Sequence, residues 1–235
     1  MAQPPEPTTT HVPALNKPYT SDMLPAGFVF KPKARCLLDH YLVPKALHGR
    51  VPDDVIQDAI ADGIDVYAVR PEALPFPPRN CGTYDGHFEA WGYFFGTRPA
   101  AAAAGGGDGD VRDVSAGGCW CRYGREKEYA DDDGEVYGFQ TRHAFYEARD
   151  GGERTPWRVK EFRLNEGAAC FRGVTFHPSA KDLVVWKVYN VVELPEEEPA
   201  EDYYSSDEDD EENEAKMNRF KVGDLCIAGP AANTA

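Results

Sequence analysis

The stretch CWCRYGREKEY (residues 119–129) sets the architecture of this chain, together with GFQTRHAFY (138–146) and WRVKEFRL (157–164). Arginine, lysine and aromatic residues alternate along all three stretches, and this period of two predicts β-strands. The turns between them contain DDDG (131–134) and DGG (150–152), the residues that β-hairpins favour. A basic, aromatic β-ribbon can lie in a nucleic-acid groove, with charges on phosphates and other side chains on base edges.

The rest of the chain predicts further strands and two short helices. Apolar and aromatic runs favour strands at 64–69, 91–95, 135–147 and 183–192. A short helix is expected from Ala34 to Leu42, where Pro44 should stop it, and a second from Pro52 to Ala61. Few helices among many adjacent strands predict an α+β fold, a twisted antiparallel β-sheet with helices packed at its edge or face.

Composition divides the chain into an arm, a domain and a tail. Residues 1–22 are rich in proline and threonine and predict a disordered arm, and residues 23–192 form the expected folded domain. Inside that domain, RPAAAAAGGGDGD (98–110) predicts a mobile loop. Residues 193–235 predict an acidic disordered tail.

Charge is concentrated in the tail. The whole chain has a net charge of −15. Residues 21–190 contain 21 Lys and Arg against 25 Asp and Glu, whereas residues 191–235 contain 3 against 14. The folded part is therefore close to neutral, which is compatible with a basic surface in an acidic protein.

The sequence argues against membrane, metal and enzyme functions. No apolar run approaches the roughly 20 residues of a membrane span, and the N-terminus lacks the features of a signal peptide. The six cysteines are scattered, so we expect reduced intracellular thiols and no metal site. The six histidines show no ligand or triad spacing, and no glycine-rich phosphate loop joins a strand to a helix. We expect no enzyme activity, small-molecule substrate or cofactor.

A series of motifs, in order, resembles the plant NAC transcription-factor domain. LPAGFVFKP (24–32) resembles that family's LPPGFRFHP, and TPWRVKEFRL (155–164) resembles its TDWIMHEYRL. The remaining motifs are DVYAVRPEALP (65–75), GYFF (92–95) with Arg98, GCWCRYGREK (118–127), GFQTRHAFY (138–146) and LVVWKVY (183–189). The chain is identified as a divergent member of this family over about residues 24–191.

The resemblance implies a twisted antiparallel sheet packed between a few short helices, a nuclear location, double-stranded DNA as a partner, dimerisation and transcription regulation. In the family, the strand that matches residues 120–127 enters the major groove edge-on. Candidate DNA contacts are Arg98, Arg112, Arg122, Tyr123, Gly124, Arg125, Lys127, Gln140, Arg142, Arg158 and Lys160.

A strand period of two assigns the side chains of this stretch to two faces. Tyr123, Arg125 and Lys127 are expected on one face, and Trp120, Arg122 and Gly124 on the other. Gly124 would let the backbone approach the duplex closely. Trp120 is expected in the core rather than on a base. Arg163 is expected to pair with Glu161 or with another acid.

Several positions lack the charge that the family carries. Gln140 and Thr141 stand where the family has two lysines, and Arg142 is a candidate replacement for one of them. A family arginine aligns with Asp113, and the neighbouring Arg112 could compensate. Each missing phosphate contact flattens the salt dependence of binding by about one unit, so weaker binding is expected.

The dimer contact also departs from the family. An arginine and acidic residues of the family's N-terminal motif are replaced at Val29 and at 34–36. Apolar pairing, with this chain or with another family member, is expected through Leu24, Pro25, Gly27, Phe28 and Phe30. A second hypothesis is therefore a protein-interaction module that binds DNA weakly and modulates full-length NAC partners.

The tail allows three interpretations. It is a solvating segment, a contact for the transcription machinery, or a segment that folds back on the basic ribbon and competes with DNA. Ser205 and Ser206 each have an acid three residues on and are expected phosphorylation sites. A phosphate adds a charge of about −1.5 to −2 and strengthens the second and third roles.

Overall fold

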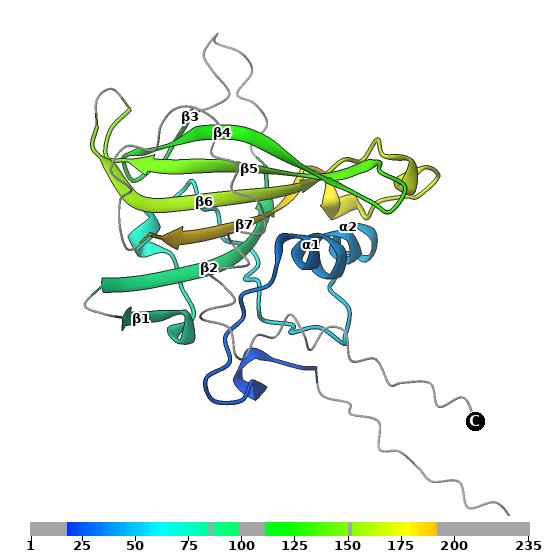
Figure 1. Ribbon diagram of the computed structural model, residues 1–235, viewed down its shortest axis with the longest axis horizontal. Helices are drawn as coiled ribbons and strands as arrows, with labels where there is room; N and C mark the ends of the chain where they lie inside the picture. The colour runs from blue at the N-terminus through cyan, green and yellow to red at the C-terminus, as the bar shows by residue number, and fades with distance from the viewer. Residues whose placement is uncertain (1–17, 85–86, 99–110, 150–151, 192–235) are drawn as a thin grey trace, which may run out of the picture.

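The computed structural model describes residues 18–84, 87–98, 111–149 and 152–191. In this part of the chain, seven strands form one sheet in the order β1-β2-β7-β6-β5-β4-β3, with every neighbouring pair antiparallel (Figure 1). The strands are β1 (Cys81–Tyr84), β2 (His87–Thr97), β3 (Val111–Asp113), β4 (Cys119–Ala130), β5 (Val136–Tyr146), β6 (Arg154–Leu164) and β7 (Leu183–Asn190). The predicted α+β class with an antiparallel sheet is confirmed.

The predicted strands in the second half of the chain are confirmed as β4, β5, β6 and β7, and residues 91–95 lie inside β2. The turn after β4 closes as predicted, because the Asp131 amide donates to the Glu135 carbonyl at 2.9 Å. Gly134 completes this turn with a φ of 82°. The predicted loop at 98–110 falls outside the described residues except for Arg98, as do the arm up to residue 17 and the tail from residue 192.

One continuous helical segment crosses the sheet. It consists of α1 (Ala34–Leu37), a π-helical turn η2 (Leu38–Leu42) and α2 (Val43–His48). The prediction that Pro44 stops the helix is wrong. Pro44 lies in the first turn of α2, where a missing amide hydrogen is tolerated, and the wider π turn before it leaves room for the ring. The helix ends at Gly49, which has a φ of 72°.

Five short 3₁₀ turns complete the helical structure that is described. They are η1 (Ser21–Met23), η3 (Pro71–Ala73), η4 (Pro78–Asn80), η5 (Ala169–Phe171) and η6 (Pro178–Ala180).

The predicted helix at 52–61 is wrong, because the structure has a series of turns there. Its apolar residues are nevertheless buried as a helical stripe would be, among them Val55 and Ile56. The segment ends by joining the sheet, since the Ala61 amide donates to the Tyr93 carbonyl at 2.9 Å. Tertiary contacts with β2 therefore replace the helical hydrogen bonds.

The predicted strand at 64–69 is also wrong. Asp65 instead caps a turn, with its Oδ1 accepting from the Tyr67 amide at 2.9 Å. Val66 and Tyr67 are buried beneath that turn.

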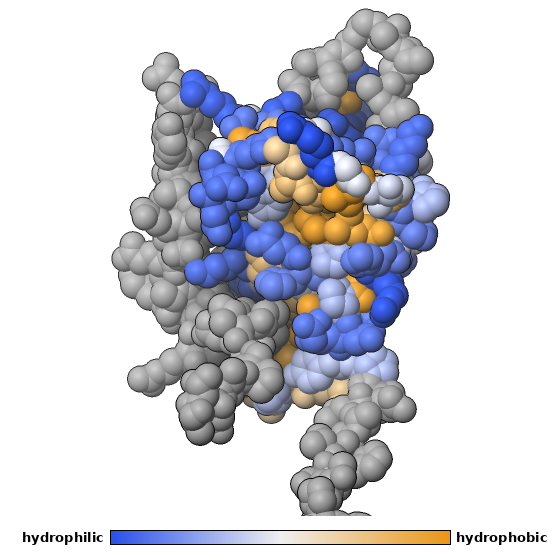
Figure 2. Space-filling view, turned by 90° about the vertical axis from the view of Figure 1, so that its right-hand side faces the viewer, coloured by the Kyte–Doolittle hydropathy of each residue, from blue (hydrophilic) through white to orange (hydrophobic). Residues whose placement is uncertain are grey.

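Each face of the sheet packs against a different segment. On the face with the helical segment, Leu38 and Tyr41 pack with residues such as Phe162. On the opposite face, Tyr67 packs with Trp120 and Trp186. The helical segment lies towards the β4–β5 hairpin end of the sheet (Figure 1). Seen from that side, the surface has a hydrophobic centre bordered by hydrophilic residues (Figure 2).

The described cysteines form no disulfide. Cys119 and Cys121 lie on the same face of β4, with their sulfurs 3.6 Å apart. Burial, followed by the neighbouring Cys121, raises the pKa of Cys119 to about 11. Its thiol therefore stays protonated at neutral pH. Among the described residues, no helix has the length and hydropathy of a membrane span.

Candidate nucleic-acid interface

The outer edge of β4 is the feature on which the candidate interface is built. β3 pairs with β4 only over Cys119–Cys121. Beyond Cys121, no other strand of the described residues pairs with this edge. Arg122 and Arg125 are exposed there and Lys127 is half-buried. We refer to residues 122–127 as the β4 edge.

A bulge interrupts the β4 edge. Tyr123 is opposite Arg142 and Lys127 is opposite Gln140, so residues 124–126 of β4 lie opposite Thr141 alone. Such a bulge bends a strand and re-aims its side chains. By register, Tyr123 and Lys127 keep the common face that the sequence predicts, whereas Arg125 lies within the bulge instead of continuing the alternation.

Gly124 makes this bulge possible. Its φ is 65°, in the left-handed region that favours glycine. A methyl group at Gly124 would lie 2.4 Å from Nη2 of Arg142. Arg142 in turn lies 5.1 Å over the ring of Tyr123. The hydrogen side chain of Gly124 thus admits a guanidinium from β5 beside the bulge.

A salt bridge neutralises one carboxylate of the β4 edge. Nη2 of Arg163 lies 3.0 Å from Oε1 and from Oε2 of Glu126. Arg163 also lies 4.0 Å over the ring of Phe139. Arg163 therefore pairs with an acid as predicted, and that acid is Glu126.

Two candidate contacts are engaged by a buried carboxylate in β6. Arg112 donates to both oxygens of Glu161, and Nε of Arg98 lies 3.4 Å from Oε1 of the same residue. Trp186 donates to Glu161 at 2.9 Å and Tyr67 donates at 3.2 Å. Burial alone would raise the pKa of Glu161, but the hydrogen bonds and charge of Arg112 outweigh it and hold that pKa below its usual value.

Three further candidate positions are directed into the protein. Gln140 is buried and accepts from the Tyr129 hydroxyl at 2.8 Å. Thr141, at the other lysine position of the family, is also buried. Arg158 is buried and donates to the carbonyls of Thr155 and Trp157.

The remaining candidates lie on the face of the sheet that carries the helical segment. Lys160 is half-buried, with its ammonium 5.9 Å from the ring centroid of Tyr189. Sequence reasoning missed Lys187, whose Cα is the partner of Lys160 in the neighbouring strand β7. No signal in the sequence reveals this neighbour, because β6 and β7 are aligned only by the folded register.

Trp120 is completely buried and packs against Phe145 with ring centroids 5.2 Å apart, which confirms the prediction that it belongs to the core.

Some of the predicted dimer residues are buried and others are accessible at the surface. Leu24 and Phe30 are buried in the chain's own core. Pro25 and Gly27 are exposed, and Phe28 is half-buried.

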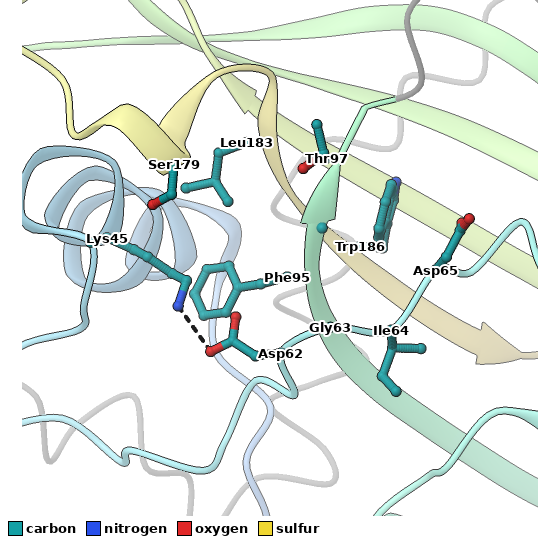
Figure 3. Close-up of a pocket in the computed structure, with 12 residues that line it drawn as sticks. Lys45, Asp62, Gly63, Ile64, Asp65, Phe95, Thr97, Ser179, Leu183 and Trp186 are labelled. Carbon is teal, nitrogen blue, oxygen red and sulfur yellow. Dashed lines mark hydrogen bonds and ion pairs between the residues drawn. The ribbon is translucent and has the colours of Figure 1, made fainter.

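A pocket of about 460 Å³ lies elsewhere, between α2, residues 62–65 and the adjoining ends of β2 and β7 (Figure 3). Lys45 and Asp62 form an ion pair of 2.9 Å at its wall, and the Lys45 ammonium lies 4.6 Å from the ring centroid of Phe95. These interactions link α2 to residue 62 and to the sheet, and Asp65, Thr97 and Ser179 add further polar side chains to the wall. Within the described ranges, no cluster of His, Cys, Asp or Glu has metal-site geometry.

Comparison with known proteins places these features in a family. The model of the "No apical meristem (NAM) protein" family matches residues 25–164, from the N-terminal motif to the end of β6. NAC domain-containing protein 101 of Arabidopsis thaliana is 28% identical over 142 residues, which is 60% of this chain. The match spans 37% of the length of that relative. The chain belongs to the NAC (No apical meristem) family of transcription regulators.

Proposed function

We propose that this protein is a nuclear transcription regulator that binds double-stranded DNA by docking the β4 edge in the major groove. The observation that carries this proposal is a bulged strand edge, with Arg122 and Arg125 exposed and no described strand paired to it. A β-ribbon fits the width of the major groove. Arginine can form a paired hydrogen bond with a guanine edge, and lysine can neutralise a phosphate.

The local charge balance supports docking at this edge. Glu126 would repel a phosphate backbone, but its salt bridge to Arg163 neutralises it. Arg142 lies beside Gly124 and brings a further guanidinium to the bulge. Binding at these groups would release condensed counterions and make affinity salt-dependent.

The affinity is expected to be modest for this family. Arg98 and Arg112 interact with Glu161, and Arg158 donates to backbone carbonyls. Gln140 and Thr141 are buried at the positions where the family carries lysines. Fewer phosphate contacts imply a flatter slope of log affinity against log salt, by about one unit for each phosphate that is not neutralised.

The same observations favour a second candidate function. A chain with the family fold and fewer cations directed at DNA could act by pairing with other NAC proteins and modulating their DNA binding. The exposed Pro25 and the half-buried Phe28 are the residues of the N-terminal motif that such a contact would use. For both candidate functions, DNA binding and modulation of other NAC proteins, we propose that the chain dimerises through this motif with a second copy or with another family member.

A gel-shift titration at two salt concentrations tests the proposal. The double variant Arg125→Ala with Lys127→Ala should lose the salt-dependent duplex binding of the wild type. The matched control is Arg172→Ala with Lys181→Ala, which removes two exposed cations outside the β4 edge. Equal binding by wild type and the first variant would contradict groove docking. An absence of duplex binding by the wild type, together with co-purification of a NAC partner, would favour the second function.

A further inference from the structure

A row of cations crosses the face of the sheet that carries the helical segment. Arg142 in β5 is opposite Lys160 in β6, and Lys160 is opposite Lys187 in β7. Tyr123 of β4 continues the row at one end, and Tyr93 of β2 continues it at the other. We call Arg142, Lys160 and Lys187 the cationic row.

The cationic row places like charges at directly opposed positions in two successive strand pairs. Such pairs destabilise a sheet, and here all three side chains are half-buried. Tyr189 offsets part of the repulsion, since its ring centroid lies 5.9 Å from the Lys160 ammonium and 5.5 Å from that of Lys187.

The neighbouring positions add positive charge. The next row across the same strands consists of Cys121, Ala144, Arg158, Tyr189 and Trp91. Neither of these two rows contains an aspartate or a glutamate, and Arg158 contributes a buried guanidinium. The two rows therefore contribute four cations and no carboxylate of their own, a composition complementary to that of a polyanionic chain.

We propose that the cationic row is the docking site of an acidic segment of this same chain, residues 193–214. That segment contains 13 Asp and Glu and no Lys or Arg. Its charge is complementary to the row, and its aromatic residues Tyr203 and Tyr204 suit a surface on which tyrosines lie at both ends of the cationic row.

The point at which the chain leaves the sheet favours an intramolecular contact. β7 carries Lys187, ends at Asn190 and is followed by Val191, whose amide donates to the Pro156 carbonyl at 2.9 Å. An extended chain covers roughly 3.5 Å per residue, so the acids at 193 and 196–198 lie within reach of the row. A tether this short gives an effective concentration on the order of millimolar.

Docking of this segment would regulate the proposed function. Arg142 belongs to the cationic row and also lies beside Gly124 at the bulge, so a carboxylate on Arg142 would compete with a DNA phosphate. Phosphorylation of Ser205 or Ser206 would add negative charge to the segment and strengthen that competition. This consequence rests on the proposed DNA binding, whereas docking of the segment does not.

Carbodiimide cross-linking of the full-length protein, read by mass spectrometry, tests the docking without DNA. The reagent joins a carboxylate to a lysine amine when the two are in contact. Lys160 and Lys187 should link to residues 193–214 several-fold more than the exposed Lys181 does. These links should decline several-fold at about 0.5 M salt, where the Debye length falls well below 8 Å. Equal linkage to Lys181, or no linkage to the row, would overturn the proposal.

Two further cross-linking experiments test whether the acidic segment of the same chain occupies the cationic row. The variant Arg142→Gln should reduce the links several-fold, whereas Arg172→Gln, at an exposed arginine outside the row, should leave them unchanged. In a mixture of ¹⁴N and ¹⁵N protein, links within one copy support the proposal, and links only between copies contradict it. Absent links with intact duplex binding would overturn the docking alone. Intact links without duplex binding would overturn the proposed function alone.

Discussion

Arg112 in the edge strand β3 donates to both carboxylate oxygens of Glu161 in β6, across the two strands that lie between them. The Nη2–Oε1 distance is 3.2 Å, and Glu161 is completely buried. Tyr67, from the turn segment that covers this face, and Trp186, from the neighbouring strand β7, donate to the same carboxylate. This ion pair holds the short strand β3 to the centre of the sheet, and β3 in turn sets where the β4 edge begins.

Removing the carboxylate should destabilise the fold. Glu161→Gln leaves the Arg112 guanidinium without its counterion, and breaking one partner of a buried ion pair costs about 3 kcal/mol. Chemical denaturation would measure the loss in the free energy of unfolding. The double variant Glu161→Gln with Arg112→Met removes both charges, keeps an acceptor for Tyr67 and Trp186, and should lie closer to wild type. A double variant less stable than Glu161→Gln would contradict this account.

The stability contributed by Glu161 should depend on pH in a defined direction. Its pKa is lowered in the folded state, so its contribution is complete above the unfolded value of about 4.3. The contribution is lost as the pH falls through the folded pKa. The difference in unfolding free energy between wild type and Glu161→Gln should therefore be constant near pH 7 and shrink below about pH 4. A difference that grew on acidification would reverse the assigned sign.

A methyl group at Gly124 should disturb both the backbone and Arg142. Gly124→Ala adds a side chain to a residue with a φ of 65° and places a carbon 2.4 Å from Nη2 of Arg142. The control is Gly134→Ala, because Gly134 has a φ of 82° but nothing within 4 Å of the added carbon. Both variants should lose about 1 kcal/mol from backbone strain. The end of the flexible Arg142 side chain can move aside, so the two variants should lose similar stability in thermal unfolding. Only Gly124→Ala should weaken duplex binding, because it displaces Arg142 from the bulge, and equal duplex binding by the two variants would exclude a role for the Arg142 contact.

Restoring a family lysine at position 140 should not restore DNA affinity. Gln140 is buried and accepts a hydrogen bond from Tyr129, so Gln140→Lys should lower stability by about 2 kcal/mol. By contrast, Glu128→Lys reverses an exposed charge beside the β4 edge and should tighten binding in a low-salt gel shift without loss of stability. Tighter binding by Gln140→Lys at unchanged stability would show that position 140 reaches DNA.

The N-terminal motif should separate into a core part and a surface part. Phe30 makes edge-to-face contacts with Tyr41 and Tyr93, at centroid distances of 5.4 and 5.1 Å. Phe30→Ala should therefore cost about 3–5 kcal/mol of folding stability. Pro25→Ala, at an exposed residue of the same motif, should change stability by about 1 kcal/mol or less. Denaturation curves distinguish the two variants, and sedimentation of the Pro25 variant tests whether the proposed dimer uses this surface.

Sequence patterns were sufficient for the central strands of this fold. The alternation in 119–129, 138–146 and 157–164 predicts β4, β5 and β6, and aspartate and glycine predict the turn at 131–134. The pattern at 52–61 misleads, because turns bury the same apolar residues as a helix would. Local spacing cannot distinguish these outcomes, since contacts with β2 decide between them.

In the candidate site too, features within one strand can be predicted from the sequence, whereas contacts between distant segments cannot. The cations of the β4 edge follow from their positions in one strand. Sequence alone cannot show that Arg112 turns inward to Glu161, because the two residues are 49 positions apart. The cationic row depends on β7 lying between β2 and β6, an order that the chain sequence does not reveal.

The bulge in β4 has a consequence for how such a protein can diversify. The hydrogen-bonded ladder resumes at Lys127 after residues 124–126, so Arg125 and Glu126 lie outside the regular pairing on which the sheet depends. Under the proposed groove docking, a substitution at Arg125 would change base recognition with little effect on folding, because the regular pairing of β4 does not depend on this position.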